Sequence, residues 1–156
     1  MKKNILIIGG SSGIGLQIVK KLNVEHNVFV ANRTNEWLSG LNHQYIKVDV
    51  SKETLDPSYL PDSLDGLVYC PGSINLRPFR GLKPETFIED FNLNVMGAVR
   101  SINAVLKNLN NSSQASIVLF STVAVQIGMP FHSSVAVSKG AIEGLTRSLA
   151  AELAPK

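Results

Sequence analysis

The segment from Asn4 to Gly15, which reads NILIIGGSSGIG, decides the fold. Its first part, Asn4–Ile8, is strongly apolar and predicts a buried parallel strand. Glycines at positions 9, 13 and 15 then allow a tight turn and a close approach of the backbone. Leu16–Leu22 follows with apolar residues at helical spacing, and Asn27–Ala31 reads as a second buried strand. The segment therefore opens a βαβ unit.

This strand, turn and helix predict a site for a phosphate group. The first N–H groups of a helix have no partner within the helix, and they favour an anion placed at the N-terminus. A glycine-rich turn alone is weak evidence, since many such turns bind nothing. Within a βαβ unit, however, the same turn cradles the pyrophosphate of a dinucleotide. We therefore expect a dinucleotide to contact Gly9, Ser11, Ser12, Gly13, Ile14 and Gly15.

The rest of the sequence alternates strands with helices. Further strands are predicted at Tyr45–Val50, Leu64–Cys70 and Ser116–Ser121, with helices at Pro84–Leu109 and Ser133–Leu153. The segment 34–44 has room for a brief helix at most. This alternation predicts an α/β fold, a Rossmann-like doubly wound parallel sheet with helices on both faces. Because the chain stops just after a helix, we expect a fold truncated after the fifth strand and the helix that follows it.

One apolar stripe stands out in the helix predicted at Pro84–Leu109. Pro84 suits the first position of a helix, where its missing N–H costs nothing. The stripe, at helical spacing, consists of Phe87, Phe91, Val95, Val99, Ile102 and Leu106. We expect this stripe to face the core or a second copy of the chain.

Composition bounds the class of protein. The 156 residues, 44% hydrophobic and 17% charged, suit one domain spanning residues 1–156. No apolar run is long enough to cross a bilayer, so no membrane partner is expected. The net charge of +3 is dispersed, which argues against a nucleic-acid partner. A single cysteine, Cys70, excludes an internal disulfide and fits a cytoplasmic location. No metal site is predicted.

The end of the second strand bears on the choice of dinucleotide. An acidic residue there would bind the ribose hydroxyls, but this chain has Asn32 followed by Arg33. The planar guanidinium of Arg33 suits a 2′-phosphate, which a carboxylate would repel. NADP(H) is therefore favoured over NAD(H). The alternative is that Arg33 is an ordinary solvated arginine. Asp49, after the third strand, either accepts a hydrogen bond from the adenine amino group or caps the next turn.

These residues give the chain a clear resemblance to the short-chain dehydrogenase/reductase family. Its pattern Gly-x-x-x-Gly-x-Gly is matched at Gly9, Gly13 and Gly15, and Asp49-Val50 is similar to its adenine-contacting pair. Asn94-Val95-Met96-Gly97 resembles its Asn-Val-x-Gly segment. The resemblance implies that Asn94 shapes its helix and holds a water in a proton relay. The alternative is a buried asparagine whose hydrogen bonds only satisfy its amide.

Two family motifs are altered. The family's Asn-Ala-Gly is represented by Cys70-Pro71-Gly72, so Cys70 is expected to be a small buried side chain beside the cofactor, not a nucleophile. The family's Tyr-x-x-x-Lys retains its lysine as Lys139, which the resemblance assigns to the nicotinamide ribose. The tyrosine position holds Val135, which has no proton to give. Thirteen residues earlier stands Thr122, beside Ser121, and either hydroxyl is a candidate to polarise a carbonyl.

A replacement proton donor is sought near Val135. Ser134 adjoins it, and His132 stands where a loop meets the helix, with a side chain suited to acid catalysis. His132 is equally well explained as a surface residue at the start of the helix. Two hypotheses follow. One is an NADP(H)-dependent oxidoreductase acting on a small carbonyl or alcohol, with His132, Ser134 or water moving the proton.

The other hypothesis is a catalytically silent dinucleotide-binding sensor, scaffold or assembly subunit. It follows from the missing tyrosine. In both cases the resemblance implies a homodimer or homotetramer, formed through the long helix and the helix of Lys139. The family's substrate loop lies beyond a sixth strand, so the substrate itself is not predicted.

Overall fold

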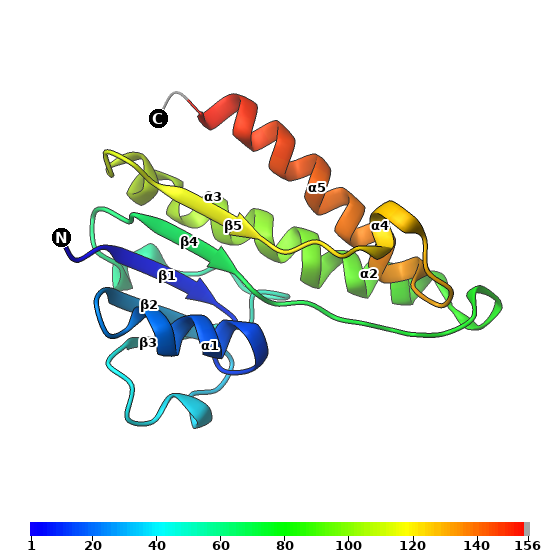
Figure 1. Cartoon of the computed structure of the whole chain (residues 1–156), viewed down its shortest axis with the longest axis horizontal. Helices are drawn as coiled ribbons and strands as arrows, with labels where there is room; N and C mark the ends of the chain where they lie inside the picture. The colour runs from blue at the N-terminus through cyan, green and yellow to red at the C-terminus, as the bar shows by residue number, and fades with distance from the viewer. Residues whose placement is uncertain (155–156) are drawn as a thin grey trace.

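The computed structural model describes residues 1–154, so Pro155 and Lys156 of the predicted domain lie outside the described residues. The described chain builds one parallel sheet in the order β3-β2-β1-β4-β5 (Figure 1). Its strands are β1 (Asn4–Ile8), β2 (Asn27–Asn32), β3 (Gln44–Lys47), β4 (Gly66–Tyr69) and β5 (Ser116–Leu119). The strand order reverses between β1 and β4, which is where a doubly wound sheet binds its ligand.

Helices cover both faces of the sheet, as predicted (Figure 1). One face carries α1 (Gly13–Leu22), and the other carries α3 (Gly97–Asn110) and α5 (Ser133–Leu153). The shorter helices are α2 (Pro84–Phe91), α4 (Ala124–Ile127), and the 3₁₀ turns η1 (Glu36–Leu38), η2 (Pro57–Tyr59) and η3 (Phe79–Gly81). Within residues 1–154, no helix combines the length and the apolar character needed to cross a membrane.

The core explains why β1 is apolar from Ile5 to Ile8. Leu6 and Ile8 are buried with the α3 residues Ala98 and Val105, whereas Ile7 belongs to the cluster on the α1 face. Successive side chains of a strand point to opposite faces, so a strand covered on both sides needs apolar residues at every position. Each fully buried side chain of this kind contributes about 1.5–3 kcal/mol.

Three strands end earlier than the sequence predicted. The third was expected at Tyr45–Val50, but β3 ends at Lys47, which is paired with the last residue of β2. Beyond it the Asp49 side chain accepts hydrogen bonds from Ser51 and turns the chain. β4 and β5 are likewise shorter than expected, because they pair with each other only over Gly66–Tyr69 and Ser116–Leu119.

The predicted long helix is continuous but contains a π-helical turn. This turn, η4 (Asn92–Met96), joins α2 to α3, and the helix runs to Asn110. A π-helical turn widens the hydrogen-bond spacing from i→i+4 to i→i+5. Within this turn, the backbone carbonyl of Leu93 accepts a 2.6 Å hydrogen bond from the Tyr69 hydroxyl. The turn thereby anchors this helix to the end of β4.

The apolar stripe expected along this helix is only partly correct. Val95 and Ile102 are buried, but Phe91 is 37% exposed. The polar side chains of Asp90 and Asn94 take up the buried face instead, at 1% and 0% exposure. Buried polar groups of this kind require hydrogen-bond partners. The helix therefore holds a polar network where the sequence pattern suggested an apolar seam.

Candidate functional site

A cavity of about 600 Å³ opens at the carboxyl ends of the strands. Ligand sites of small molecules commonly have volumes of roughly 300–1,000 Å³. Its walls include every cofactor-contacting residue predicted from the sequence except Lys139, namely Gly9, Ser11, Ser12, Gly13, Ile14, Gly15, Asn32, Arg33, Asp49, Val50, Cys70 and Gly72. Segments distant in sequence thus line one cavity.

The glycine turn provides the phosphate end of this cavity. Gly9 and Gly13 have φ angles of +78° and +53°, which L side chains rarely adopt. A side chain at Gly15 would collide with the backbone carbonyl oxygen of Gly9, so glycine is required where α1 packs on the end of β1. The start of α1 presents its first N–H groups, which a helix leaves without internal partners, beside this turn. This geometry fits a pyrophosphate.

Two basic residues, Arg33 and Lys52, line the cavity beside Asp49. The pKa of the Asp49 carboxyl is lowered chiefly by the hydrogen bond from the Ser51 hydroxyl, 2.6 Å from Oδ1, and also by the positive charges of Lys52 and Arg33. Asp49 therefore caps the turn, which is one of the two roles predicted for it. Lys52 adds a second cation that sequence reasoning missed.

Arg100 of α3 holds this turn in place. Its Nη2 atom donates to the backbone carbonyls of Val50 and Ser51, at 2.8 and 3.0 Å. These two bonds tie the wall of the cavity to a helix beneath it. The sequence gave no signal for this role, because the partners are backbone atoms about fifty positions away.

Lys139 and Asn94 converge on Gly72. A side-chain carbon built on Gly72 would lie 3.3 Å from Asn94 Oδ1 and 3.6 Å from Lys139 Nζ. Burial lowers the pKa of Lys139, and the nearby Cys70 thiol opposes this effect. Burial also raises the pKa of Cys70 to about 11, so the thiol stays protonated near neutral pH. A protonated thiol is a poor nucleophile.

The Asn94 amide belongs to a buried network. Its Nδ2 donates to the Ser73 hydroxyl at 3.0 Å and to the Asp90 backbone carbonyl at 2.8 Å. The Ser73 hydroxyl in turn donates to Asp90 Oδ1, which also accepts from Asn75 Nδ2 at 2.9 Å. Sequence reasoning missed Ser73 and Asp90. The available signal was a polar pair, Asp90 and Asn94, four positions apart on one helix face.

The hydroxyl candidates after β5 have local partners. Ser121 Oγ donates to Glu143 Oε1 of α5 at 2.7 Å. Thr122 Oγ1 accepts from the backbone N–H of Ala124 at 3.3 Å. Neither residue lines the 600 Å³ cavity. Of the two, Ser121 is the more exposed and is already engaged by a carboxylate.

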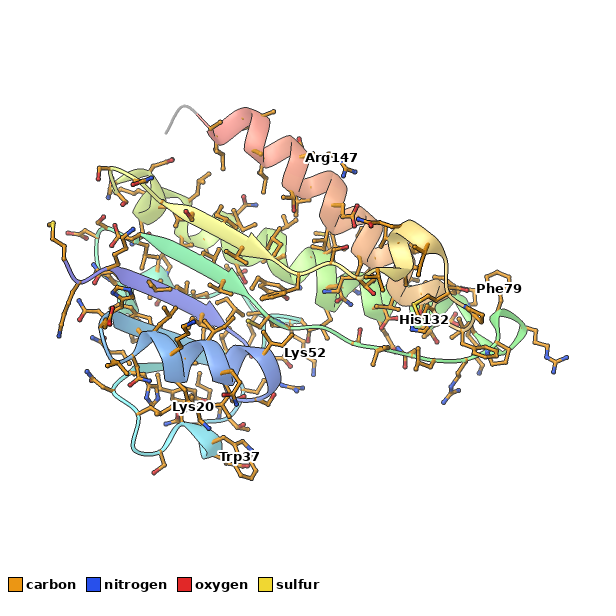
Figure 2. All side chains as sticks on the ribbon, in the orientation of Figure 1. Lys20, Trp37, Lys52, Phe79, His132 and Arg147 are labelled. Carbon is orange, nitrogen blue, oxygen red and sulfur yellow. The ribbon has the colours of Figure 1, made fainter. Side chains whose placement is uncertain are left out.

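The candidate proton donors differ in their surroundings. Val135 is only 5% exposed, and Ser134 is buried with a hydroxyl that has no hydrogen-bond partner among residues 1–154. His132 Nδ1 lies 2.7 Å from the carbonyl oxygen of Pro130, so that nitrogen carries a proton. Figure 2 shows His132 well away from Lys52, on the part of the molecule that carries Phe79. Neither His132 nor Ser134 lines the 600 Å³ cavity.

The wall of the 600 Å³ cavity also contains residues that the sequence did not predict, and a second cavity lies elsewhere in the molecule. The walls not predicted from the sequence include Ser51, Pro71, Glu89, Asn92 and Leu93. A separate apolar cavity of about 270 Å³ lies between α3, β5 and α5 and lacks ionisable side chains. No group of three or more potential metal ligands occurs in the described part of the chain.

Comparison with known proteins agrees with this geometry. The family model for short chain dehydrogenases matches residues 3–156. The chain belongs to the short-chain dehydrogenase family. A crystal structure of a family protein from Francisella tularensis superposes with a TM-score of 0.85 at 28% identity, covering 99% of this chain and 65% of that one. This short-chain dehydrogenase therefore has the family's parallel sheet over its described length.

Characterised relatives of this short-chain dehydrogenase are oxidoreductases by name. Cyclopentanol dehydrogenase of a Comamonas strain is 27% identical, with 98% of this chain and 68% of the relative aligned. Human retinol dehydrogenase 8 is 30% identical over 97% of this chain and 54% of its own length. The chain thus spans little more than half of the human relative and about two thirds of the bacterial one.

Proposed function

We propose that this chain is the cofactor-binding part of an NADP(H)-dependent oxidoreductase that interconverts a small carbonyl and its alcohol with a non-standard proton donor. The observation that carries the proposal is the single cavity that joins the glycine turn, Arg33 and Gly72 at the carboxyl edge of the sheet. An open α/β sheet binds its ligand at this edge, where the strand order reverses.

The walls of the cavity fit a dinucleotide. The glycine turn and the start of α1 would hold the pyrophosphate, and Asn32 and Val50 would flank the adenosine. Arg33 and Lys52 together would bind a 2′-phosphate, which NAD(H) lacks. Lys139 and Gly72 would lie beside the nicotinamide ribose. When bound, the nicotinamide ring supplies or accepts a hydride.

The remaining chemistry is the transfer of a proton to or from the substrate oxygen. Lys139, with its lowered pKa, would bind the ribose and place its positive charge near that oxygen. Thr122 or Ser121 would hydrogen-bond the substrate oxygen. Asn94, which borders the same space beside Gly72 as Lys139, would hold a water in the proton relay. Because Val135 has no acidic proton, the proton would come from His132, from Ser134 or from water.

Isothermal titration with NADPH and NADH tests the cofactor. We expect NADPH to bind at least about tenfold more tightly, as charge-assisted hydrogen bonds to one phosphate would require. Turnover is then assayed over a panel of carbonyls and alcohols, and Lys139→Ala should lower kcat/KM by at least about tenfold. Equal affinity for the two nucleotides would contradict the NADP(H) preference, and no binding of either would contradict the proposal.

A catalytically silent protein is the second candidate, and Val135 favours it. The side chain at the expected tyrosine position is apolar and 5% exposed, so it offers no proton. On this alternative the chain binds the dinucleotide as a sensor, scaffold or assembly subunit. Tight binding of NADPH without turnover on any substrate of the panel would support this function over the first.

The proposal extends to the partners, the oligomeric state and the location of the protein. We propose a small-molecule substrate, no nucleic-acid or membrane partner, and a homodimer or homotetramer in the cytoplasm. The half-exposed Phe91 and the exposed Ile88 on α2 support self-association, because apolar side chains on a helix surface favour burial against a second copy. Light scattering of the purified protein measures its oligomeric state.

A further inference from the structure

A chain of hydrogen bonds runs from the buried carboxyl group of Asp90 to the amide of Asn94. Ser73 stands between them, since its hydroxyl donates to Asp90 Oδ1 and accepts from Asn94 Nδ2 at 3.0 Å. Asp90 and Asn94 are 1% and 0% exposed. Ser73 and Asn75 are half-buried, but Asp90 and Asn94 have no contact with bulk water, so a hydrogen bond lost by either of these two is costly.

The direction of these bonds fixes the orientation of the Asn94 amide. Asp90 Oδ1 is an acceptor, so the proton of the Ser73 hydroxyl is committed to it, and Ser73 Oγ is left to accept. The second hydrogen of Asn94 Nδ2 goes to the Asp90 backbone carbonyl, 2.8 Å away. A flipped amide would set its oxygen against both of these acceptors. The nitrogen must therefore face Ser73.

The consequence is seen on the other side of the amide. Asn94 Oδ1 is buried and has no hydrogen-bond partner among residues 1–154. A side-chain carbon built on Gly72 would lie 3.3 Å from Asn94 Oδ1 and 3.6 Å from Lys139 Nζ, so both atoms border the same space. The amide thus presents an unpartnered acceptor to the space that the Lys139 ammonium group, which has only donors, also borders. No carboxylate of the described residues lies within ion-pair distance of that ammonium.

We propose that Ser73 and Asp90 are positioning residues, which orient the Asn94 amide so that its oxygen borders the space beside Gly72 that the Lys139 ammonium also borders, at the cofactor-binding edge. Asn75 supports the same arrangement through its bond to Asp90 Oδ1. The role assigned to Lys139 rests on the proposed function. The orientation of the Asn94 amide does not, because the bonds that set it lie within the protein.

Variants of Ser73, Asp90 and Ser101 separate this role from general destabilisation. Ser73→Ala removes the acceptor from Asn94, whereas Ser73→Thr keeps the hydroxyl. Ser101→Ala is the control, because the Ser101 hydroxyl is buried even more deeply than that of Ser73 and bonds the Gly97 carbonyl at 2.8 Å, outside the network. Asp90→Leu removes the carboxyl group that accepts the hydrogen bond from Ser73, and Asp90→Asn keeps one side-chain oxygen as an acceptor.

Side-chain amide NMR of the protein without cofactor provides the first readout. Both hydrogens of the Asn94 side-chain amide are hydrogen-bonded. We therefore expect them to exchange at least about tenfold more slowly than those of the exposed Asn110. Ser73→Ala and Asp90→Leu should reduce this protection, although the bond to the Asp90 backbone carbonyl remains, whereas Ser73→Thr, Asp90→Asn and Ser101→Ala should keep it. Unchanged exchange in Ser73→Ala, or equal loss in Ser101→Ala, would overturn the proposal.

NADPH affinity provides the second readout. We expect Ser73→Ala to weaken NADPH binding about fivefold to tenfold, and Ser101→Ala to leave it within twofold, as the loss of one hydrogen bond predicts. Failure of the wild-type protein to bind NADPH would reject the proposed function, while the amide exchange would still decide the orientation. Normal NADPH binding by Ser73→Ala would reject the link between this network and Lys139.

Discussion

The Tyr69 hydroxyl donates a 2.6 Å hydrogen bond to the backbone carbonyl of Leu93. Tyr69 ends β4, and Leu93 lies in the π-helical turn that also contains Asn94. A side chain at Gly97 would collide with the same hydroxyl. Burial raises the pKa of Tyr69, so its hydroxyl remains a donor throughout the physiological range. One tyrosine thus sets how closely the helix of Asn94 approaches the sheet.

Gly97→Ala should destabilise the fold, because its methyl group would meet the Tyr69 hydroxyl. We expect a loss of about 1–3 kcal/mol in the free energy of unfolding, measured with urea, as for overpacked cores. Gly144→Ala on α5 is the control. A methyl group there meets nothing within 4 Å, so it should stabilise the helix by about 0.5–1 kcal/mol.

A double variant checks the cause of this destabilisation. Tyr69→Phe removes the oxygen that the new methyl group would meet, so Gly97→Ala should cost less in that background. The same cost in both backgrounds would show that the collision with the hydroxyl does not limit residue 97.

The fold was predictable because its signals are local. The apolar run at Asn4–Ile8 and the glycines after it define a strand and a turn without reference to distant residues, and the full span of α5 followed from helical spacing alone. Strand ends were not predictable. β3 stops where its partner β2 stops, and that limit is set by pairing between strands, which periodicity does not encode.

The two basic residues of the cavity should determine the choice of nucleotide. Arg33→Ala and Lys52→Ala should each weaken NADPH binding by about tenfold while changing NADH binding little, because NADH has no 2′-phosphate for them to bind. Isothermal titration of both nucleotides measures the effect. Lys47→Ala, an exposed lysine of β3 that does not line the cavity, is the control. An equal loss for NADPH and NADH would place these residues elsewhere than at a 2′-phosphate.

Asp65 should make the stability of the fold depend on pH. Its carboxyl accepts from the Ser112 hydroxyl at 2.7 Å and from the Asn4 N–H at 2.8 Å, and these bonds hold its pKa below the usual value. A lowered pKa in the folded state stabilises the protein above the unfolded pKa of about 3.9. The benefit is lost as the pH falls through the lower folded value.

Asp65→Asn should therefore reduce stability near pH 7, and the reduction should shrink as the pH falls from about 3.9 through the lower folded pKa. The expected loss at neutral pH is about 1 kcal/mol or less, because the carboxyl is only partly buried. Urea unfolding across this range measures it, with the exposed Asp62→Asn as the control. A difference between wild type and Asp65→Asn that does not shrink in acid would contradict the argument.

The site was harder to predict than the fold. The glycine turn and Arg33 follow strand ends directly, so their place at the edge of the sheet follows from the topology. Arg100, Asp90 and Ser73 act through atoms that are distant in sequence, and only the folded chain brings these partners together. Lys52 follows a turn whose shape depends on the Asp49 side chain, and no pattern along the chain signals that shape.

The exchange of Val135 for tyrosine tests what replaces the missing hydroxyl. A tyrosine there would stand four residues before Lys139, on the same helix face, which is the spacing that the family motif requires. Because Val135 is 5% exposed, the larger ring should cost about 1–3 kcal/mol of stability, and Val135→Phe should cost the same without supplying a proton. The difference between the two variants isolates the hydroxyl.

If another group already delivers the proton, as we propose, the wild-type protein should turn over its substrate and Val135→Tyr should lower kcat as much as Val135→Phe does. If the protein is silent, Val135→Tyr alone should create turnover, because Lys139 would lower the pKa of the new phenol. Steady-state kinetics with NADPH over a carbonyl panel separates these outcomes. Activity in Val135→Tyr but in neither wild type nor Val135→Phe would exclude a resident proton donor at His132 or Ser134.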